Sequence, residues 1–374
     1  MGFPFGRPAN PFGLYHHHIL PSHEPNLEIR IPPGDDGVIL AIWAETRLMN
    51  QQPRPPWFLR GPHRQTLAGH FLPGKMIGPP QKRHFVPLQD GDTLVVHENI
   101  PPKWNPARPM VVLVHGLTGS HASNTIRRLA IQLVNANIAC QRLDMRGAGD
   151  GFALAKKPYN GGCSEDLEAA LTHLSRIYPQ TPMGIMGVSL GANVTLRLAG
   201  TLGDQAPIRF PNWRGLVAMN PPVDLGACCK LLELPRNRIY ERTFLKELWE
   251  AEIQRRTIHP DLFPLKGTTP RNLRDFDTRV TAPNWGFADA DEYYKWGSSI
   301  THLSKVKVPG WVLTARDDPF VDHHPLEALG SRVGSMEIEI HDHGGHMGYL
   351  VWKRGFHRWA EPKMVQRIRE FIEK

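Results

Sequence analysis

The pattern of apolar and polar residues changes near residue 80. Residues 1–80 are rich in proline, glycine and aromatic residues, and apolar residues recur at helical spacing only near 37–50. Downstream, short apolar or alternating runs, which predict strands, take turns with segments whose apolar residues have helical spacing. Residues 83–88 and 93–98 flank the turn Asp90-Gly91 and are predicted to form a β-hairpin.

A regular alternation of strand and helix follows this hairpin. It predicts strands at 110–114, 138–143, 182–188 and 215–219, and helices at 123–135, 164–177 and 192–202. Strands such as Val111-Val112-Leu113-Val114 are apolar on both faces, which is typical of a parallel sheet covered by helices on both sides. The chain is therefore predicted to be an α/β protein with a mostly parallel sheet and helices on both faces.

The alternation stops after Pro222 and resumes near residue 300. The segment between contains amphipathic stretches such as 241–256, but no strand of the same kind, and we interpret it as an inserted helical cap. The remaining elements are predicted as strands at 310–315 and 336–340, a short helix near 325–329 and a closing helix at 361–373.

These changes divide the chain into four predicted parts. They are an N-terminal proline- and glycine-rich arm at 1–80, the first part of the α/β core at 81–221, the helical cap at 222–299 and the second part of the core at 300–374. The arm contains His16-His17-His18, which we interpret as an incidental surface run because no second cluster of ligands accompanies it.

The net charge and the distribution of basic residues bear on whether the protein binds nucleic acid. The 374 residues carry a net charge of +8, which raises the question of anionic partners. The basic residues are dispersed, and pairs such as Lys82-Arg83 lack interleaved aromatic residues, so we expect a solvated surface and no nucleic-acid partner.

The location is predicted from what the sequence lacks. No apolar run reaches the roughly 20 residues of a membrane-spanning helix, and the first residues lack the order of a signal peptide. The 4 cysteines are too few and too irregularly spaced for a disulfide framework or a zinc site. We expect a cytoplasmic protein without an integral membrane segment, metal or cofactor, and no pattern indicates its oligomeric state.

The segment Gly187-Val188-Ser189-Leu190-Gly191 carries the first candidate chemistry. It has the form Gly-x-Ser-x-Gly and stands between a predicted strand and a predicted helix. In that context the serine occupies a strained turn that lifts its hydroxyl clear of the sheet, and glycines are needed where a side chain would clash. Ser189 is therefore a candidate nucleophile.

A nucleophilic serine needs a base and an acid that orients the base. Loops after the last two predicted strands supply both residue types, in the order serine, acid, histidine. The candidates for the acid are Asp317 and Asp318, and we favour Asp318 because a proline directly follows it. For the base we favour His346, after a Gly-Gly pair, over His341 and His343. These histidines can also be read as metal ligands, but no carboxylate-rich motif with metal spacing accompanies them.

The tetrahedral intermediate of such a reaction needs two backbone N–H donors. One is expected from Leu190, the residue after the nucleophile. The second is expected from Leu117, in the loop His115-Gly116-Leu117-Thr118 that directly follows the strand at 110–114.

Several longer motifs resemble a known family. They are HGLTGS at 115–120, GVSLGAN at 187–193, His63-Arg64-Gln65-Thr66, Arg146-Gly147, the segment FDTRVTAPNWGFADADEYYKWGSS at 276–299, DDPF at 317–320 and GGHMGY at 344–349. From residue 56 to the C-terminus the chain resembles the YheT-like family of α/β-hydrolase-domain proteins. That family is expected to consist of carboxylesterases, related to eukaryotic membrane-associated lipid hydrolases and to yeast acyltransferases that form ethyl esters.

The resemblance implies the α/β-hydrolase fold and a charge-relay triad of Ser189, Asp318 and His346. Departures occur at Ala192, where a glycine is common, and at residues 146–149, and they bear on substrate detail rather than on the fold. The motif at residues 63–66 is specific to the family, but the sequence gives it no physical role.

Together these residues predict a serine hydrolase that cleaves carboxylic esters of short- to medium-chain acyl groups or of lipids through an acyl-enzyme. An acyltransferase that forms esters from acyl donors and alcohols would use the same residues. A non-catalytic binding protein with the same fold is a third alternative, and the sequence does not specify the natural substrate.

Overall fold

The computed structural model describes residue 52 and residues 54–72, 74–262, 268–353 and 355–374. The run His16-His17-His18, the helix expected near 37–50 and most of the predicted arm lie outside the described residues. The described residues all belong to one compact unit, Arg47–Lys374.

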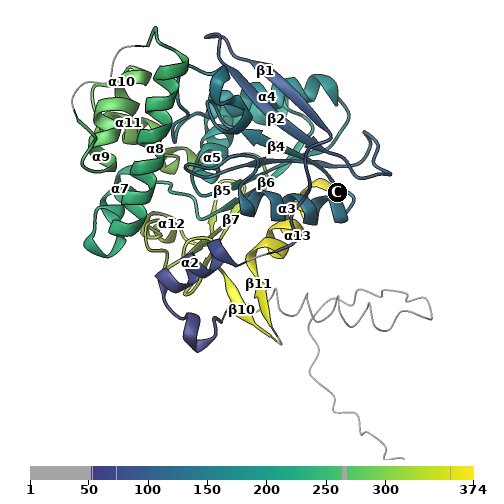
Figure 1. Cartoon of the computed structure of the whole chain (residues 1–374). Coiled ribbons are helices and arrows are strands. Elements are labelled where there is room, and N and C mark those ends of the chain that lie inside the picture. Colours follow the sequence, from purple (N-terminus) through teal and green to yellow (C-terminus); the bar gives the residue numbers. More distant parts are fainter. Residues whose placement is uncertain (1–51, 53, 73, 263–267, 354) are drawn as a thin grey trace, which may run out of the picture. The chain divides into compact units, whose positions relative to one another are not determined.

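A nine-stranded sheet lies at the centre of the described part of the chain (Figure 1). In spatial order its strands are β1 (Lys82–Pro87), β2 (Thr93–Asn99), β4 (Ala139–Asp144), β3 (Met110–Val114), β5 (Met183–Val188), β6 (Trp213–Met219), β7 (Gly310–Ala315), β9 (Met336–His341) and β8 (Arg332–Val333). The strands from β4 to β9 in this order pair in parallel. At the two edges β1, β2 and β8 pair antiparallel. The predicted hairpin and the mostly parallel sheet are confirmed.

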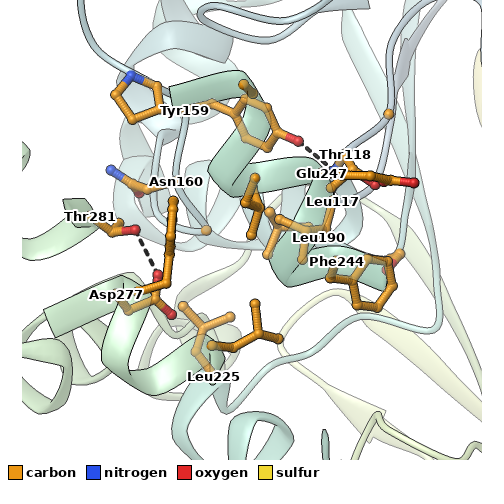
Figure 2. Close-up of a pocket in the computed structure, with 18 of the residues that line it drawn as sticks. Leu117, Thr118, Tyr159, Asn160, Leu190, Leu225, Phe244, Glu247, Asp277 and Thr281 are labelled. Carbon is orange, nitrogen blue, oxygen red and sulfur yellow. Dashed lines mark hydrogen bonds between the residues drawn. The ribbon is translucent and has the colours of Figure 1, made fainter. Parts of the chain in front are cut away.

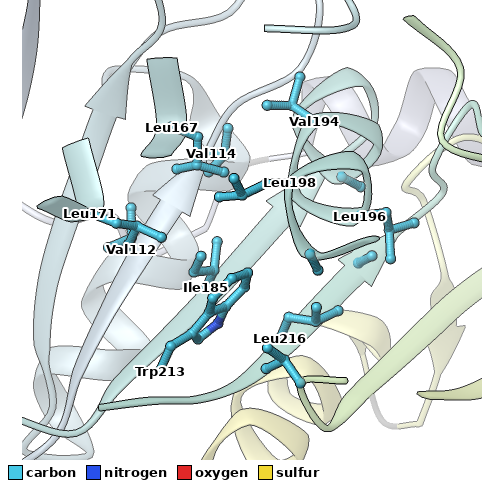
Figure 3. Close-up of a cluster of buried hydrophobic side chains, with 14 of the residues drawn as sticks. Val112, Val114, Leu167, Leu171, Ile185, Val194, Leu196, Leu198, Trp213 and Leu216 are labelled. Carbon is cyan, nitrogen blue, oxygen red and sulfur yellow. The ribbon is translucent and has the colours of Figure 1, made fainter. Parts of the chain in front are cut away.

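Helices cover both faces of the sheet, as the alternation predicts. They are α3 (Asn124–Asn135) and α13 (Ala360–Ile372) on one face and α4 (Ser164–Ile177) and α5 (Leu190–Leu202) on the other. Val112 and Val114 of β3 belong to the apolar layer with α4 and α5, part of which Figure 3 shows. Val111 and Leu113 belong to the layer with α3 and α13. One apolar strand serves both layers because successive side chains point to opposite faces.

Only helices and loops connect β6 to β7 in the described ranges (Figure 1). They are α7 (Leu225–Leu232), η4 (Pro235–Asn237), α8 (Arg238–Ile258), α9 (Leu273–Phe276), the π-helix η5 (Asp277–Thr281), α10 (Ala282–Trp285), α11 (Ala290–Gly297) and η6 (Ile300–Lys305). The helix expected at 241–256 is confirmed as the central part of α8. The division into four parts stays a prediction.

Short elements complete the described chain, and several were not predicted from the sequence. They are η1 (Trp57–Leu59), α2 (Pro62–Phe71), η2 (Gly149–Leu154), η3 (Gly203–Gln205), α6 (Ala206–Arg209), α12 (His324–Ala328) and the antiparallel pair β10 (Leu350–Trp352) and β11 (Phe356–Arg358). The sequence analysis expected no helix at α2. Its buried residues are Gln65, Thr66 and Gly69, so it has no apolar stripe for periodicity to reveal.

Two further observations concern the whole described chain. Among its helices, none combines the length and the apolar character needed to cross a membrane. The four cysteines are free and buried.

Candidate active site

Ser189 stands at the sharp turn between β5 and α5. Its backbone has φ 52° and ψ −125°, in a region that residues with a side chain rarely adopt. Gly187 and Gly191 permit this turn, because a Cβ on either would collide with backbone of the turn itself or of the end of β3. The sequence GVSLG therefore forms a strained elbow at the carboxyl ends of the parallel strands.

Ser189, His346 and Asp318 form a continuous chain of contacts. His346 Nε2 lies 3.0 Å from Ser189 Oγ, and His346 Nδ1 lies 2.8 Å from Asp318 Oδ2. The Asp318 side chain is fully buried, and the ring of Phe320 packs on the imidazole with the ring centroids 4.1 Å apart. When the serine hydroxyl donates to Nε2, Nδ1 carries the ring proton and donates to Asp318. The structure thus brings together the three residues proposed from the sequence as nucleophile, base and acid.

The two adjacent aspartates have different partners. Besides His346, Asp318 binds the backbone N–H groups two and three residues further along the chain through Oδ1, at 3.1 and 3.0 Å. Asp317 Oδ1 instead accepts hydrogen bonds from the backbone N–H groups of Gly344 and Gly345, both at 2.8 Å. Asp317 therefore shapes the loop that carries His346, whereas Asp318 contacts the imidazole itself.

The two other candidate histidines have partners away from Ser189. His341 is buried, and its ring nitrogens lie 2.6 Å from oxygens of Glu339 and Gln52. His343 lies on the surface, with Nδ1 3.5 Å from Asp317 Oδ2. Of the three histidines considered from the sequence, the structure brings His346 to the serine.

Two residues that the sequence analysis missed extend this network behind Asp318. Asn220 Nδ2 donates to Asp318 Oδ2 at 2.7 Å, and the Tyr349 hydroxyl donates to Asn220 Oδ1 at 3.1 Å. Both residues are buried and have positive φ, 48° and 43°. The available signal for Asn220 was a polar residue placed directly after an apolar strand, at the sheet edge that also carries Ser189.

Helix α2 fastens the loop that carries His346. Thr66 Oγ1 accepts a hydrogen bond from the backbone N–H of His346 at 2.9 Å. Gln65 is buried and binds both backbone groups of Leu350, with its Oε1 2.8 Å from the nitrogen and its Nε2 3.3 Å from the oxygen. Two residues of the motif at 63–66 therefore hold both ends of the loop from His346 to β10.

The loop after β3 lies against the serine. A Cβ on Gly116 would stand 3.0 Å from the Cβ of Ser189. His115 Nε2 accepts a hydrogen bond from the backbone N–H of Met145 at 3.1 Å, so its Nδ1–H donates to the Gly116 oxygen at 2.8 Å. Burial lowers the pKa of His115, which keeps it neutral. His115 is thus a brace between two loops and not a second base.

A tyrosine fixes the next part of the same loop. Thr118 has φ 56°, and its backbone N–H donates to the Tyr159 hydroxyl at 2.6 Å. Leu117 and Leu190 line one cavity together with Ser189. Leu190 is the first residue of α5, and the first N–H groups of a helix have no acceptor within it.

The cavity at Ser189 has a volume of about 350 Å³ and extends beneath α7, α8 and α11. Its lining is mostly apolar and includes Leu117, Leu190, Leu225, Leu232, Phe244, Leu248 and Phe276. Figure 2 shows Asp277 and Thr281 at one end of this cavity and Phe244 and Thr118 at the other. Cys228 and Cys229 also line this cavity. Burial raises the pKa of both thiols, that of Cys229 to about 12, so both are neutral at ordinary pH.

Asp277 places a carboxyl group in this apolar lining. It accepts hydrogen bonds from the hydroxyls of Thr281 at 2.6 Å and Tyr294 at 2.7 Å. Burial raises the pKa of Asp277 to about 6, and the two hydroxyls only partly offset that effect. The carboxyl group therefore changes its protonation state close to neutral pH.

A second cavity, of about 620 Å³, meets the first at Ser189. Its walls are α2, the beginning of α3 and the first half of α8, and Leu67 and Phe71 stand at its exposed rim. His63 joins two of these walls, because its Nδ1 lies 3.1 Å from the Tyr240 hydroxyl of α8 and the two rings stack. We call this cavity the groove, to distinguish it from the first cavity, beneath α7 and α8.

Groups of possible metal ligands lie outside this site. His97 Nε2 and His121 Nδ1 lie 2.8 and 2.9 Å from the same oxygen of buried Asp144. The two imidazoles stack with ring centroids 3.5 Å apart and planes tilted by 17°, so one cation cannot lie in the plane of both rings. The contacts suit two N–H donors on one carboxylate, and they hold the pKa of Asp144 well below its usual range. A second such group within the described ranges, at residues 322–324, is partly exposed.

Comparison with known protein sequences identifies relatives of this chain. A family model described as Serine aminopeptidase, S33 (Hydrolase_4) matches residues 105–256. The chain is 28% identical over 266 residues to the candidate esterase YheT of Escherichia coli, which covers 70% of this chain and 77% of that protein.

Two eukaryotic relatives are similar over a smaller share of their own length. The chain is 27% identical to phospholipase ABHD3 of Mus musculus over 66% of this chain and 60% of that protein. It is 27% identical to monoacylglycerol lipase of Saccharomyces cerevisiae over 70% of this chain and 60% of that protein. The matches therefore span about 60% of the length of these two proteins. They confirm the resemblance to the YheT-like family and to other α/β hydrolases.

Solved structures with low sequence identity share the architecture. The 2,6-dihydroxy-pseudo-oxynicotine hydrolase aligns with a TM-score of 0.54 at 17% identity, over 83% of this chain and 72% of that one. Est1E from Butyrivibrio proteoclasticus aligns with a TM-score of 0.51 at 14% identity, over 78% of this chain and 99% of that one. The chain has the α/β-hydrolase fold, and its relatives support a hydrolase of the esterase or lipase type.

Proposed function

We propose that this α/β-hydrolase-fold relative of the YheT-like proteins is a serine hydrolase that cleaves carboxylic esters. In this proposal Ser189 is the nucleophile, His346 the general base and Asp318 the acid that orients it. One observation carries the proposal: a contact chain from Ser189 Oγ through both nitrogens of His346 to buried Asp318, with distances of 3.0 and 2.8 Å, where two cavities meet.

The first half of the reaction transfers the acyl group to the enzyme. Ser189 Oγ attacks the ester carbonyl carbon while its proton passes to His346 Nε2. The backbone N–H groups of Leu117 and Leu190 bind the oxyanion that forms. The bond to the leaving alkoxide then breaks, and Nε2 returns the proton to that oxygen, so that an alcohol departs.

The second half releases the acid. Water attacks the carbonyl carbon of the acyl-enzyme and gives its proton to His346 Nε2. Collapse of the new tetrahedral intermediate breaks the bond to Ser189 Oγ, which takes the proton back, and the carboxylic acid leaves. Asp318 accepts the Nδ1–H bond throughout and stabilises the imidazolium in both halves. Every step uses side chains and backbone groups of the protein alone.

The two cavities suggest how an ester divides at the serine. The mostly apolar cavity beneath α7, α8 and α11 suits the acyl chain, and the groove beside α2, which meets it at Ser189, suits the alcohol part. A short- to medium-chain acyl group, or one chain of a lipid ester, fits this arrangement. Each buried methylene contributes only about 0.8 kcal/mol, so we expect a gradual preference for chain length rather than a sharp one.

The test is hydrolysis of p-nitrophenyl esters from short to long acyl chains, together with labelling by a fluorophosphonate. We expect Ser189→Ala to lose labelling and at least about 10⁴-fold in kcat. The matched control is Ser331→Ala, which removes an exposed hydroxyl and should behave as the wild type. Labelling that persisted in Ser189→Ala would show that another serine is the nucleophile. Absence of turnover and labelling in the wild type would favour a binding protein instead.

Acyl transfer to an alcohol is the closest alternative, because the same acyl-enzyme can react with any hydroxyl that the open groove admits. Product analysis with added ethanol separates the two reactions: a hydrolase yields mainly the free acid, whereas a transferase yields the ethyl ester. The cytoplasmic location expected from the sequence stays a prediction.

A further inference from the structure

Four exposed aromatic side chains form a continuous cluster on η1 and the β10–β11 hairpin. Trp57, Phe58, Trp352 and Phe356 are 77%, 39%, 53% and 43% exposed. The ring centroid of Phe58 lies 6.2 and 6.1 Å from those of the two hairpin rings, which are 4.9 Å from each other, and Trp57 lies 5.6 Å from Phe58. We call these four residues the aromatic cluster. A contiguous group of large, solvent-exposed apolar side chains indicates an interaction surface.

The aromatic cluster lies on elements that are joined to α2, which forms one wall of the groove at Ser189. Helix α2 and the β10–β11 hairpin lie together at the lower edge of the domain in Figure 1. Arg358 of β11 donates to two carbonyl groups at the end of α2, which ties the hairpin to that helix. Leu67 and Phe71 of α2, which are 39% and 75% exposed, line the groove. The helix that forms one wall of the groove is therefore tied to the hairpin that carries two of the four rings.

The segments that build this surface are basic and free of acidic residues. Residues 46–89 and 343–360 contain no aspartate or glutamate. Arg60 directly after η1, Arg64 on α2 and Lys353 in the hairpin turn are exposed. In the described ranges no carboxylate pairs with any of these three side chains, whereas Arg358 at the hairpin base approaches Glu361. The surface thus combines exposed rings with uncompensated positive charge.

Two kinds of partner match positive charge beside aromatic rings. Single-stranded nucleic acid needs ring faces on which successive bases stack. In the aromatic cluster the rings meet edge to face, at interplanar angles of 75° to 87°, so neighbouring rings do not present a parallel row of faces. An anionic lipid bilayer needs no such row of faces, because aromatic rings enter the region of the headgroups while cationic side chains bind the phosphates.

We propose that the aromatic cluster and the basic residues around it dock the protein on the surface of an anionic phospholipid bilayer. The rings insert at the level of the headgroups, and Arg60, Arg64 and Lys353 contact lipid phosphate. In this orientation the rim of the groove at Leu67 and Phe71 faces the lipid. A lipid ester can then reach Ser189 from the membrane without crossing water. The docking does not depend on the proposed hydrolysis and can be tested separately.

The test is co-sedimentation of the full chain with vesicles. One set contains phosphatidylcholine alone, and the other contains about 30% phosphatidylglycerol; each is used at about 50 mM and about 500 mM salt. We expect binding to the anionic vesicles at low salt that weakens at least tenfold at high salt, since ions screen the contacts with phosphate. Vesicles of phosphatidylcholine alone should bind at least tenfold more weakly.

Three double variants locate the docking surface. Trp57→Ser/Trp352→Ser removes two rings of the aromatic cluster, and Arg60→Glu/Lys353→Glu reverses two charges beside it. Each should weaken binding to anionic vesicles at least tenfold. The matched control, Ile208→Ser/Lys103→Glu, makes the same types of change at exposed residues outside these segments and should bind as the wild type. Melting temperatures and, if the protein is a hydrolase, turnover of a short soluble ester should be the same in all four proteins.

Several outcomes would overturn the proposal. One is wild-type protein that does not bind anionic vesicles. Another is a pair of double variants that bind these vesicles as well as the control does. A dimer that Trp57→Ser/Trp352→Ser converts to a monomer would assign the surface to a second copy. Salt-sensitive retention on single-stranded DNA without vesicle binding would assign it to nucleic acid.

Discussion

Asp317 and Asp318 are adjacent in the sequence, yet their carboxylates bind different parts of one loop. Asp318 Oδ2 lies 2.8 Å from the imidazole Nδ1 of His346, whereas Asp317 Oδ1 accepts the backbone N–H groups of Gly344 and Gly345. One carboxylate orients the ring, and the other holds the backbone from which the ring projects. Their separate contacts make the two residues a matched pair for mutation.

Changing each aspartate to asparagine should therefore have unequal effects. In Asp318→Asn the amide N–H can donate to His346 Nδ1, which favours the tautomer with the proton on Nε2. Nε2 then cannot accept the Ser189 proton, so we expect kcat for a p-nitrophenyl ester to fall about 10⁴-fold. In Asp317→Asn the amide oxygen still accepts both N–H groups, and kcat should stay within about tenfold of the wild type. Equal losses in the two variants would contradict the assignment of Asp318.

Tyr159 should affect catalysis through the loop that carries Leu117. Tyr159→Phe removes the acceptor of the Thr118 N–H, which lies 2.6 Å from the hydroxyl, and leaves that donor without its partner. If the Leu117 N–H binds the oxyanion, kcat should fall by up to about 100-fold, within the range for loss of one donor, while KM changes little.

The control for this change is Tyr178→Phe, which removes a hydroxyl bonded to Glu98, far along the sheet. It should lower stability without lowering kcat. A Tyr159→Phe enzyme with unchanged kcat would show that the loop keeps its shape without the hydroxyl.

Gln65 in α2 should matter for activity although it touches neither substrate nor triad. Gln65→Leu removes both hydrogen bonds to the backbone of Leu350 and buries unpaired groups, which costs on the order of 2 kcal/mol in the free energy of unfolding. We also expect a clear loss in kcat, because the loop with His346 loses one of its two anchors on α2. Urea unfolding and steady-state kinetics measure the two effects.

Gln81→Leu is the matched control. Gln81 also binds both backbone groups of one residue, Ile100, but it does so at the surface and away from the serine. It should cost less stability than Gln65→Leu and leave kcat unchanged. Parallel losses of kcat in the two variants would mean that α2 has no special role at the site.

The buried carboxyl group of Asp277 predicts a pH dependence of stability. Its pKa is about 6 in the folded protein, against an ordinary value of 3.8. Since folding raises this pKa, the stabilisation is fully present below about pH 4 and is lost as pH rises through about 6. A shift of this size corresponds to at most about 3 kcal/mol.

Asp277→Asn should remove this contribution. The difference in unfolding free energy between pH 4.5 and pH 7.5 should therefore be smaller in the variant than in the wild type, and the variant should be the more stable protein at pH 7.5. Identical pH profiles for the two proteins would show that Asp277 titrates at its ordinary pKa.

The core elements and the proximity of Ser189, Asp318 and His346 could be predicted from the sequence because their signals are local. Strand β3 is an uninterrupted apolar run, and β7 is apolar apart from Thr314. Gly187, Ser189 and Gly191 meet the steric demands of a turn within five residues. The loop with Asp318 directly follows β7, and the loop with His346 follows β9, whose apolar and charged residues alternate. Periodicity and turn chemistry are properties of neighbouring residues, so the sequence displays them.

The supports of the site could not be predicted because their function depends on distant partners. Gln65 and Thr66 lie in a helix without an apolar stripe, and they are buried only because the loop with His346 packs on them. Asn220 and Tyr159 look like ordinary polar residues until the fold places their partners beside them. The aromatic residues of β10 and β11 occur in strands of three residues, which are too short to show alternation.

The position of α2 shows that the support of the proposed active site begins upstream of the predicted core. A truncation at residue 81, where the predicted core starts, would keep all nine strands of the central sheet and every member of the proposed triad. It would remove α2, which supports the loop with His346. The backbone N–H of His346 donates to the hydroxyl of Thr66, 280 residues earlier in the chain. Such a fragment is expected to fold but to have low catalytic activity. A substitution in α2 lies outside the predicted core, yet it would act on the active site through the loop with His346.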